Sequence, residues 1–119
     1  MRSADLSPDQ LFRALADATR LRSIALLHRH GSLCVCELTD ALELSQPKVS
    51  RHLAHLRALG LVIDARRGQW VHYRLAEDLP EWIHTVIDAA TAACHAPDSP
   101  WQLDLQRSAP REGKSTDTP

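Results

Sequence analysis

The chain has 119 residues and a hydrophobic fraction of 44%, which fits one globular domain and excludes a disordered chain. Its formal net charge is −1, so it is not a basic protein as a whole, and its apolar runs are far shorter than the ~20 residues of a membrane span. Three cysteines, an odd number, argue against a disulfide-stapled secreted domain. The polar N-terminus shows no signal peptide. Together with the odd cysteine count, this predicts a cytoplasmic protein with reduced thiols and no membrane partner.

The first part of the chain predicts three helices. Ser7-Pro8-Asp9-Gln10 is typical of a helix start, with serine as N-cap, proline in the first turn and glutamine completing a capping box. A second helix is expected over about residues 18–30, ended by Gly31. A short third helix is expected over about residues 35–42.

The second part predicts a helix, a hairpin and a further helix. The fourth helix begins with Ser45 as N-cap and stops at Gly60. Two strands, 61–66 and 69–75, follow and are joined by a tight turn at Arg67-Gly68. A fifth helix is expected over about residues 79–94. Beyond it the chain is polar and rich in proline, so we expect one domain over residues 1–95 and a mostly disordered tail over 96–119. Docking of Trp101, Leu103 and Leu105 on the fifth helix is the alternative for part of this tail.

Short helices joined by a turn and followed by a hairpin predict a winged helix-turn-helix: a mainly α fold with five helices and a two-stranded wing. Between Ser45 and Arg74 six basic side chains stand against one acid, Asp64, which gives this segment a charge of +5. Such a block indicates a polyanionic partner. The alternatives are a solvated basic surface and a winged helix that binds only proteins.

The start of the fourth helix is expected to enter the major groove of double-stranded DNA, where glutamine can pair with adenine and arginine with guanine. The tip of the wing would reach phosphates or the minor groove. The residues expected to contact DNA are Ser45, Gln46, Lys48, Ser50, Arg51, His52, His55, Arg66 and Arg67.

Three stretches carry a resemblance to a known family: Leu33-Cys34-Val35-Cys36-Glu37-Leu38, residues 44–53 with their Ser-Gln-Pro start, and residues 67–75. Over about residues 11–87 the chain resembles the ArsR/SmtB family of metal-sensing repressors. The resemblance implies a homodimer, with the first and last helices at its interface. It also implies that the apo protein binds operator DNA and represses a resistance operon.

Cys34 and Cys36 supply thiolates, which are soft ligands that favour soft metals and metalloids. In a continuous helix residues two apart lie about 200° apart around the axis, so chelation by both sulfurs would require the first turn to unwind. Arsenic-sensing members of the resembled family carry Cys-x-Cys-x-x-Cys here, and this chain has Thr39 at the third position. Cys94 is the remaining thiol. It either completes the site, within the chain or across the dimer, or is a buried free thiol.

The resemblance therefore implies release from DNA when trivalent arsenic, as arsenite, binds the thiolates, with antimonite as a second possible inducer. Without Cys94, two sulfurs and a non-protein ligand would hold the metalloid. The alternatives within the same fold are a zinc- or cadmium-responsive repressor and a thiol-redox-responsive one. An enzyme is not expected, because nothing in the sequence places a base and oxyanion donors around Cys34.

Overall fold

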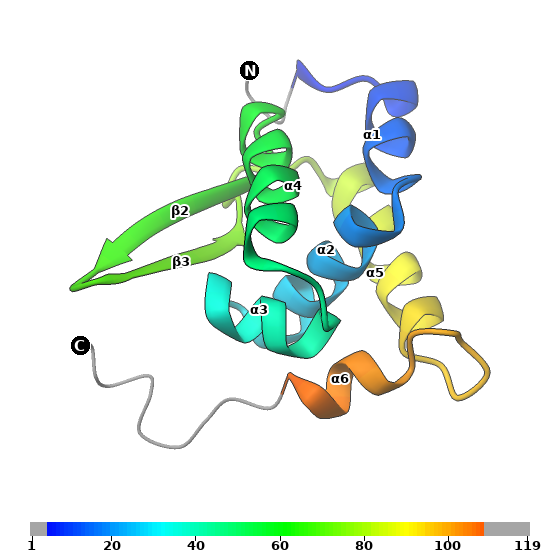
Figure 1. The fold of residues 1–119 in the computed structure, drawn as a ribbon. Helices are drawn as coiled ribbons and strands as arrows, with labels where there is room; N and C mark the ends of the chain where they lie inside the picture. Colours follow the sequence, from blue (N-terminus) through cyan, green and yellow to red (C-terminus); the bar gives the residue numbers. More distant parts are fainter. Residues whose placement is uncertain (1–4, 109–119) are drawn as a thin grey trace.

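A short strand and a final helix, neither of them predicted, join the expected helices and hairpin (Figure 1). The structure is a computed structural model that describes residues 5–108. Its mainly helical fold with an antiparallel wing confirms the predicted winged helix-turn-helix class. Within residues 5–108 no helix is long and apolar enough to cross a membrane. In chain order the elements are α1 (Pro8–Leu15), α2 (Ala18–His30), β1 (Leu33–Cys34), α3 (Val35–Leu42), α4 (Gln46–Ala58), β2 (Val62–Arg67), β3 (Trp70–Leu75), α5 (Glu81–Cys94) and α6 (Leu103–Arg107).

Polar side chains set the helix starts. Ser7 and Gln10 form the predicted capping box, in which the Ser7 N–H donates to Gln10 Oε1 at 2.9 Å. At α2 the Arg20 N–H donates to Asp17 Oδ1 at 3.1 Å, and at α4 the Lys48 N–H donates to Ser45 Oγ at 3.3 Å. The predicted starts of the first and fourth helices are therefore confirmed.

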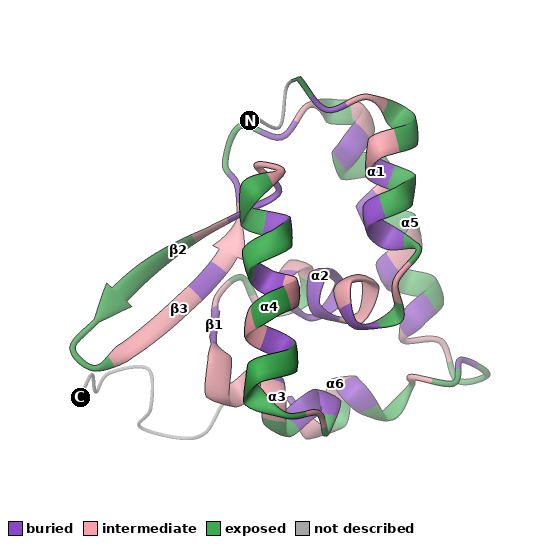
Figure 2. Cartoon of the chain, turned by 45° about the horizontal axis from the view of Figure 1, so that its top comes forward, coloured by how far each residue is buried: buried purple, intermediate pink, exposed green. Residues whose placement is uncertain are grey.

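The core lies where α2 packs against the other helices and the base of the hairpin. Leucine and isoleucine side chains from α1 through α5 are fully buried there, and Figure 2 shows these buried segments alternating with exposed ones along each helix. In α4 the buried residues are Val49, Leu53 and Leu56. Because one face of α4 is fixed against the core, its other face is left to solvent.

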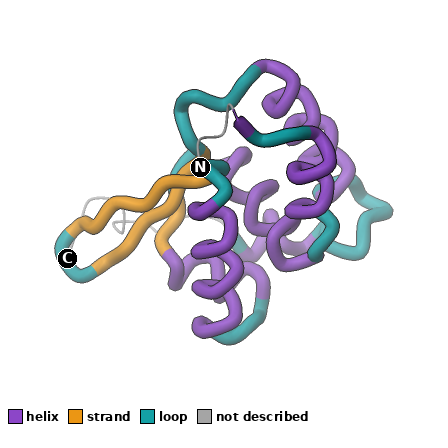
Figure 3. Tube along the Cα trace, turned by 90° about the horizontal axis from the view of Figure 1, so that it is seen from above, coloured by secondary structure: helices purple, strands orange, loops and turns teal. Residues whose placement is uncertain are grey.

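The wing is part of a three-stranded antiparallel sheet in the order β1-β3-β2. The predicted two-stranded wing is present as β2 and β3, and the unpredicted β1 pairs with the base of β3 through Leu33↔Tyr73 and Cys34↔His72. The turn is also one residue later than predicted. Arg67 pairs with Trp70 across a two-residue turn, and Gly68 supplies its positive φ of 61°. Figure 3 shows the hairpin extending away from the helices.

The segment after α5 departs from the expected disordered tail over residues 96–108. Ser99, Asp104 and Ser108 are buried there, and α6 packs against α2 and α3. The polar composition predicted disorder because it contains little apolar surface, but this segment is held by buried ion pairs instead. The boundary at residue 95 is therefore corrected, and residues 109–119 of the expected tail lie outside the described residues.

Candidate nucleic-acid interface and sensing site

The exposed face of α4 carries most of the residues expected to contact DNA. Ser45 is the N-cap, and Gln46, Lys48 and Arg51 are exposed beside it. The Gln46 amide donates to Ser50 Oγ at 2.9 Å, one turn further along the helix. This bond lies on the surface, where water or a base edge can replace it. The first two turns of α4 thus present amide, hydroxyl and cationic groups together.

The two histidines of α4 lie differently from these residues. His52 is turned toward the start of α2, where its Nδ1 lies 3.3 Å from Arg20 Nη1 and 3.7 Å from Asp17 Oδ1. Burial is the main cause that lowers the pKa of His52, and it outweighs the opposing effect of Asp17. His55 is exposed beside a cavity lined by residues of α1 and α2, including Arg13 and Arg20. His52 therefore belongs to a packed contact between helices.

The wing adds positive charge at its tip. Arg66 and Arg67 are exposed at the end of β2. Two other cations of the basic segment are neutralised, since Arg57 pairs with Asp64 at 2.9 Å and Arg74 pairs with Glu77 at 2.8 Å. Among the described residues no ion pair forms at the remaining cations of the segment, which are Lys48, Arg51, Arg66 and Arg67. These four form the exposed charge of α4 and the wing.

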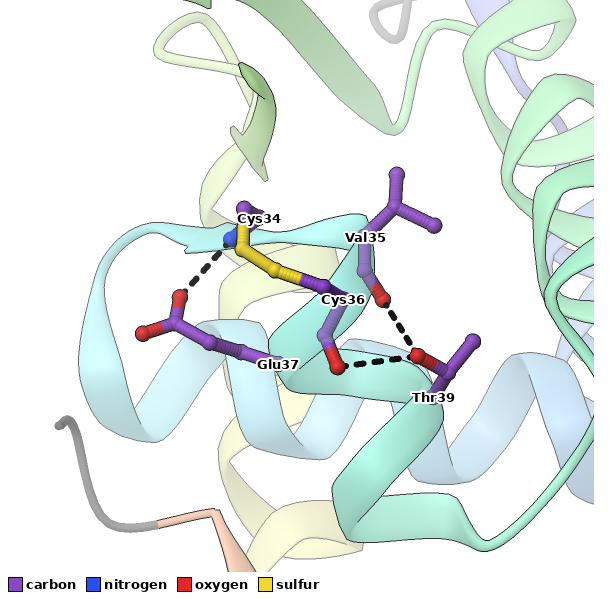
Figure 4. Close-up of a disulfide and its surroundings, with 5 residues drawn as sticks. All are labelled: Cys34, Val35, Cys36, Glu37 and Thr39. Carbon is purple, nitrogen blue, oxygen red and sulfur yellow. Dashed lines mark hydrogen bonds between the residues drawn. A yellow bond between two sulfur atoms is a disulfide. The ribbon is translucent and has the colours of Figure 1, made fainter. Parts of the chain in front are cut away.

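Cys34 and Cys36 lie where β1 turns into α3, and their sulfurs form a disulfide (Figure 4). Cys34 is the N-cap of α3, with extended backbone angles of φ −81° and ψ 162°. Because Cys34 lies outside the helical turn, the angle of about 200° between residues two apart in a helix does not apply to its side chain. The two sulfurs meet across a Cα–Cα distance of 5.4 Å. The expectation that α3 must unwind for both sulfurs to reach one atom was wrong.

Glu37 and Thr39 fix this corner. The Cys34 N–H donates to Glu37 Oε1 at 2.9 Å, as in a capping box. The Thr39 hydroxyl, which stands where the resembled family has a third cysteine, is within hydrogen-bond distance of two carbonyls of its own helix, Val35 O at 3.1 Å and Cys36 O at 2.8 Å (Figure 4). Thr39 therefore stabilises the first turn of α3.

An open cavity of about 410 Å³ connects the cysteines to the elements expected to bind DNA. It is lined by Cys34, Val35, Cys36, Thr39, Gln46, Gln69, Trp70 and Val71. Gln46 begins α4, and the last three residues belong to the turn and the inner strand of the wing. A group bound to the sulfurs thus lies next to both elements.

Cys94 does not join this site within one chain. It is buried at the end of α5, beside a different cavity lined by Leu21, Ala93 and Trp101 among others. Burial is the main cause that raises the pKa of its thiol, with a smaller contribution from Asp104. A thiol held protonated is a poor ligand, because metals and metalloids bind the thiolate.

The acidic and histidine residues of α5 also form no metal centre. His28 of α2 pairs with Asp88 of α5 at 2.8 Å. Among residues 5–108 no group of three or more histidine, cysteine or acidic side chains could hold a metal ion.

Two features of the site were not predicted from the sequence. One is the pairing of Cys34 with the wing strand through His72, and the other is the contact of the C-terminal segment with α3. The first carries no pattern signal, because a two-residue strand is too short to show alternation. The second depends on Asp104, which is 82 residues away from its partner Arg22 in the sequence.

Known proteins resemble this chain over most of its length. Residues 17–64 match the family described as bacterial regulatory protein, arsR family. The arsenic resistance transcriptional regulator ArsR1 of Pseudomonas putida is 53% identical over 88 residues, which cover 74% of this chain and 69% of that protein. The arsenical resistance operon repressor of Escherichia coli K12 is 55% identical over 85 residues, covering 71% of this chain and 73% of that one.

Solved structures show the same fold. Reduced HlyU from Vibrio cholerae superposes with a TM-score of 0.60 at 35% identity, over 71% of this chain and 81% of that chain. The AntR antimony-specific transcriptional repressor superposes with a TM-score of 0.58 at 28% identity, over 71% and 79% of the two chains. Fold, sequence and the arrangement of α3, α4 and the wing agree, and this chain belongs to the ArsR family of bacterial regulatory proteins.

Proposed function

We propose that this protein is a repressor of an arsenic-resistance operon that binds operator DNA as a homodimer and leaves it when trivalent arsenic binds Cys34 and Cys36. The single observation that carries the proposal is the shared cavity, in which both sulfurs lie beside Gln46 of α4 and Trp70 of the wing. The names of the relatives from P. putida and E. coli support the choice of inducer.

The chemistry requires the reduced dithiol. Arsenite, As(OH)₃, exchanges two hydroxyl groups for the two cysteine sulfurs: two As–O bonds break, two As–S bonds form, and each hydroxyl leaves as water with the proton of one thiol. The arsenic keeps its third oxygen, since neither Thr39 nor Cys94 offers a further sulfur at this corner. Antimonite can follow the same exchange, and the antimony-specific repressor of this fold supports including it.

Release follows from where the metalloid is held. Cys34 pairs with His72 of β3, so we expect a change at its sulfur to act on the wing. An atom bound to the sulfurs would also lie beside Gln46, the first residue of α4, which lines the same cavity. An inducer shifts the protein off DNA only by binding the free arrangement more tightly than the DNA-bound one. We expect the inducer to bind Cys34 and Cys36 more tightly once this corner of the cavity has rearranged, and that preference gives the required difference in affinity.

The test uses fluorescence anisotropy of a labelled duplex carrying the protein's own promoter. Reduced protein is titrated separately with arsenite, antimonite, zinc and cadmium. We expect release by arsenite and antimonite, and none of that release in the double variant Cys34→Ser/Cys36→Ser, which still binds the duplex. A double variant that arsenite still releases would overturn the assignment, and release by zinc or cadmium alone would move the sensor to a divalent ion.

The disulfide favours a second candidate, a repressor that responds to thiol oxidation. A peroxide would oxidise the two thiols to the Cys34–Cys36 disulfide, being itself reduced to water or an alcohol. Comparing the DNA affinity of peroxide-treated and dithiothreitol-treated protein decides between them. Equal affinities would eliminate the redox function, whereas a loss of binding that dithiothreitol reverses would support it.

A further inference from the structure

The C-terminal segment contains a buried carboxylate between two arginines. The Asp104 side chain is only 1% exposed. Arg22 of α2 donates two hydrogen bonds to this carboxylate, from Nε to Oδ2 at 2.8 Å and from Nη2 to Oδ1 at 2.9 Å. Arg107 of α6 adds a third, from Nη2 to Oδ1 at 2.8 Å. We call these three residues the α6 clamp.

Both arginines of the clamp also reach the end of α3. Arg107 Nε donates to Ala41 O at 2.7 Å, and Arg22 Nη2 donates to Leu42 O at 3.1 Å. The last carbonyls of a helix lack donors within the helix, and a cation there also favours the helix dipole. Figure 1 shows α6 running alongside α3. The C-terminal segment therefore caps the helix whose opposite end carries the two sensor cysteines.

The capped end of α3 leads directly into the DNA-reading helix. Glu43, the next residue, takes a left-handed conformation with φ 57°, and α4 begins at Gln46. Arg107 lies 3.9 Å from the Glu43 carboxylate as well. The clamp thus holds the junction between α3, which carries the sensor cysteines, and α4, the proposed recognition helix. The two ends of α3 are only about 12 Å apart.

We propose that the α6 clamp is a positioning device of the switch: it holds α3 and α4 in the arrangement that binds DNA, and inducer binding works against it. The carboxylate is buried and shared, so losing it leaves two neighbouring cations without the negative charge that holds them together. Without the clamp fewer molecules are in the DNA-binding arrangement. The apparent DNA affinity falls by that fraction, and less inducer is then needed for release.

The test is Asp104→Asn in the full chain, with Asp98→Asn as the matched control. Asp98 lies in the same segment and is exposed, and its substitution removes the same charge outside the clamp. For Asp104→Asn we expect operator binding to weaken by about tenfold, which lies within the usual range of allosteric coupling, and the arsenite midpoint to fall. The control should match wild type in both measurements.

A milder variant, Arg107→Gln, guards against loss of folding, because it keeps the two-bond contact of Arg22 with Asp104. Circular dichroism gives the folded fraction of each variant. A lower melting temperature with unchanged DNA affinity and unchanged arsenite midpoint, in both clamp variants, would overturn the proposal and leave the clamp a stabilising contact only. The measurement of the arsenite midpoint rests on the proposed function. If arsenite fails to release even wild type, that function fails, and the DNA affinities still decide on the clamp.

Discussion

Arg66→Ala with Arg67→Ala is expected to lower the salt dependence of operator binding by about half. Lys48, Arg51, Arg66 and Arg67 are the exposed cations of the basic segment without an ion pair among the described residues. A dimer would present eight such charges, and each phosphate contact contributes about 0.9 to the slope of log K against log salt. The wild-type slope should therefore approach about −7, and that of the double variant about −3.6.

The assay is anisotropy of a labelled promoter duplex over a salt series. Between about 50 and 200 mM salt, wild type should lose about 10⁴-fold in affinity and the wing variant about 10²-fold. Arg57→Ala with Asp64→Ala is the control, because it removes a 2.9 Å ion pair without changing the net charge. An unchanged slope in the wing variant, or an equal drop in the control, would refute the assignment of the wing tip to phosphate binding.

Three further predictions concern the recognition helix, the third cysteine and pH. Arg51→Ala should weaken specific operator binding by about 1–3 kcal/mol if it contacts a base, and an unchanged gel-shift affinity would exclude that role. Cys94→Ser should leave the arsenite release curve unchanged, because Cys94 lies beside another cavity, and a blunted curve would indicate a site shared across subunits. Burial of the rings is the main cause that lowers the pKa of His30, His52 and His95 below the reference of 6.5. The unfolded chain then binds more protons below about pH 6.5, so the melting temperature should fall on going from about pH 7.5 to 5.5, and His52→Gln should reduce that fall.

Local signals in the sequence predicted most of the fold. Ser7 and Ser45 mark helix starts because their side chains satisfy free backbone N–H groups, and that chemistry needs only neighbours a few residues away. The hairpin followed from alternating residues around Gly68. The exposed cations of α4 and the wing could likewise be predicted, since the buried stripe of α4 fixes which residues face outward.

The remaining features depend on contacts between distant parts of the chain. Asp104 is one acid in a polar segment, and nothing near it in sequence indicates that Arg22 will bury it. The geometry of Cys34 was missed because the angle of about 200° treats Cys34 and Cys36 as parts of one continuous helix, whereas Cys34 is the extended residue that precedes the helix. The direction of a side chain next to a helix end depends on whether its backbone is helical or extended, and pattern reasoning does not resolve that difference at helix ends.

The double position of Cys34, at once the first cap of α3 and a partner of His72 in the sheet, has a practical consequence for engineering. In a reporter strain built on this protein, the proposed function predicts that the inducer concentration at which the signal appears depends on the pairing between Cys34 and β3. If Cys34 and Cys36 hold the inducer as proposed, substitutions at position 72 should shift the detection threshold of such a biosensor while the sulfur ligands, and with them the choice of analyte, stay as they are.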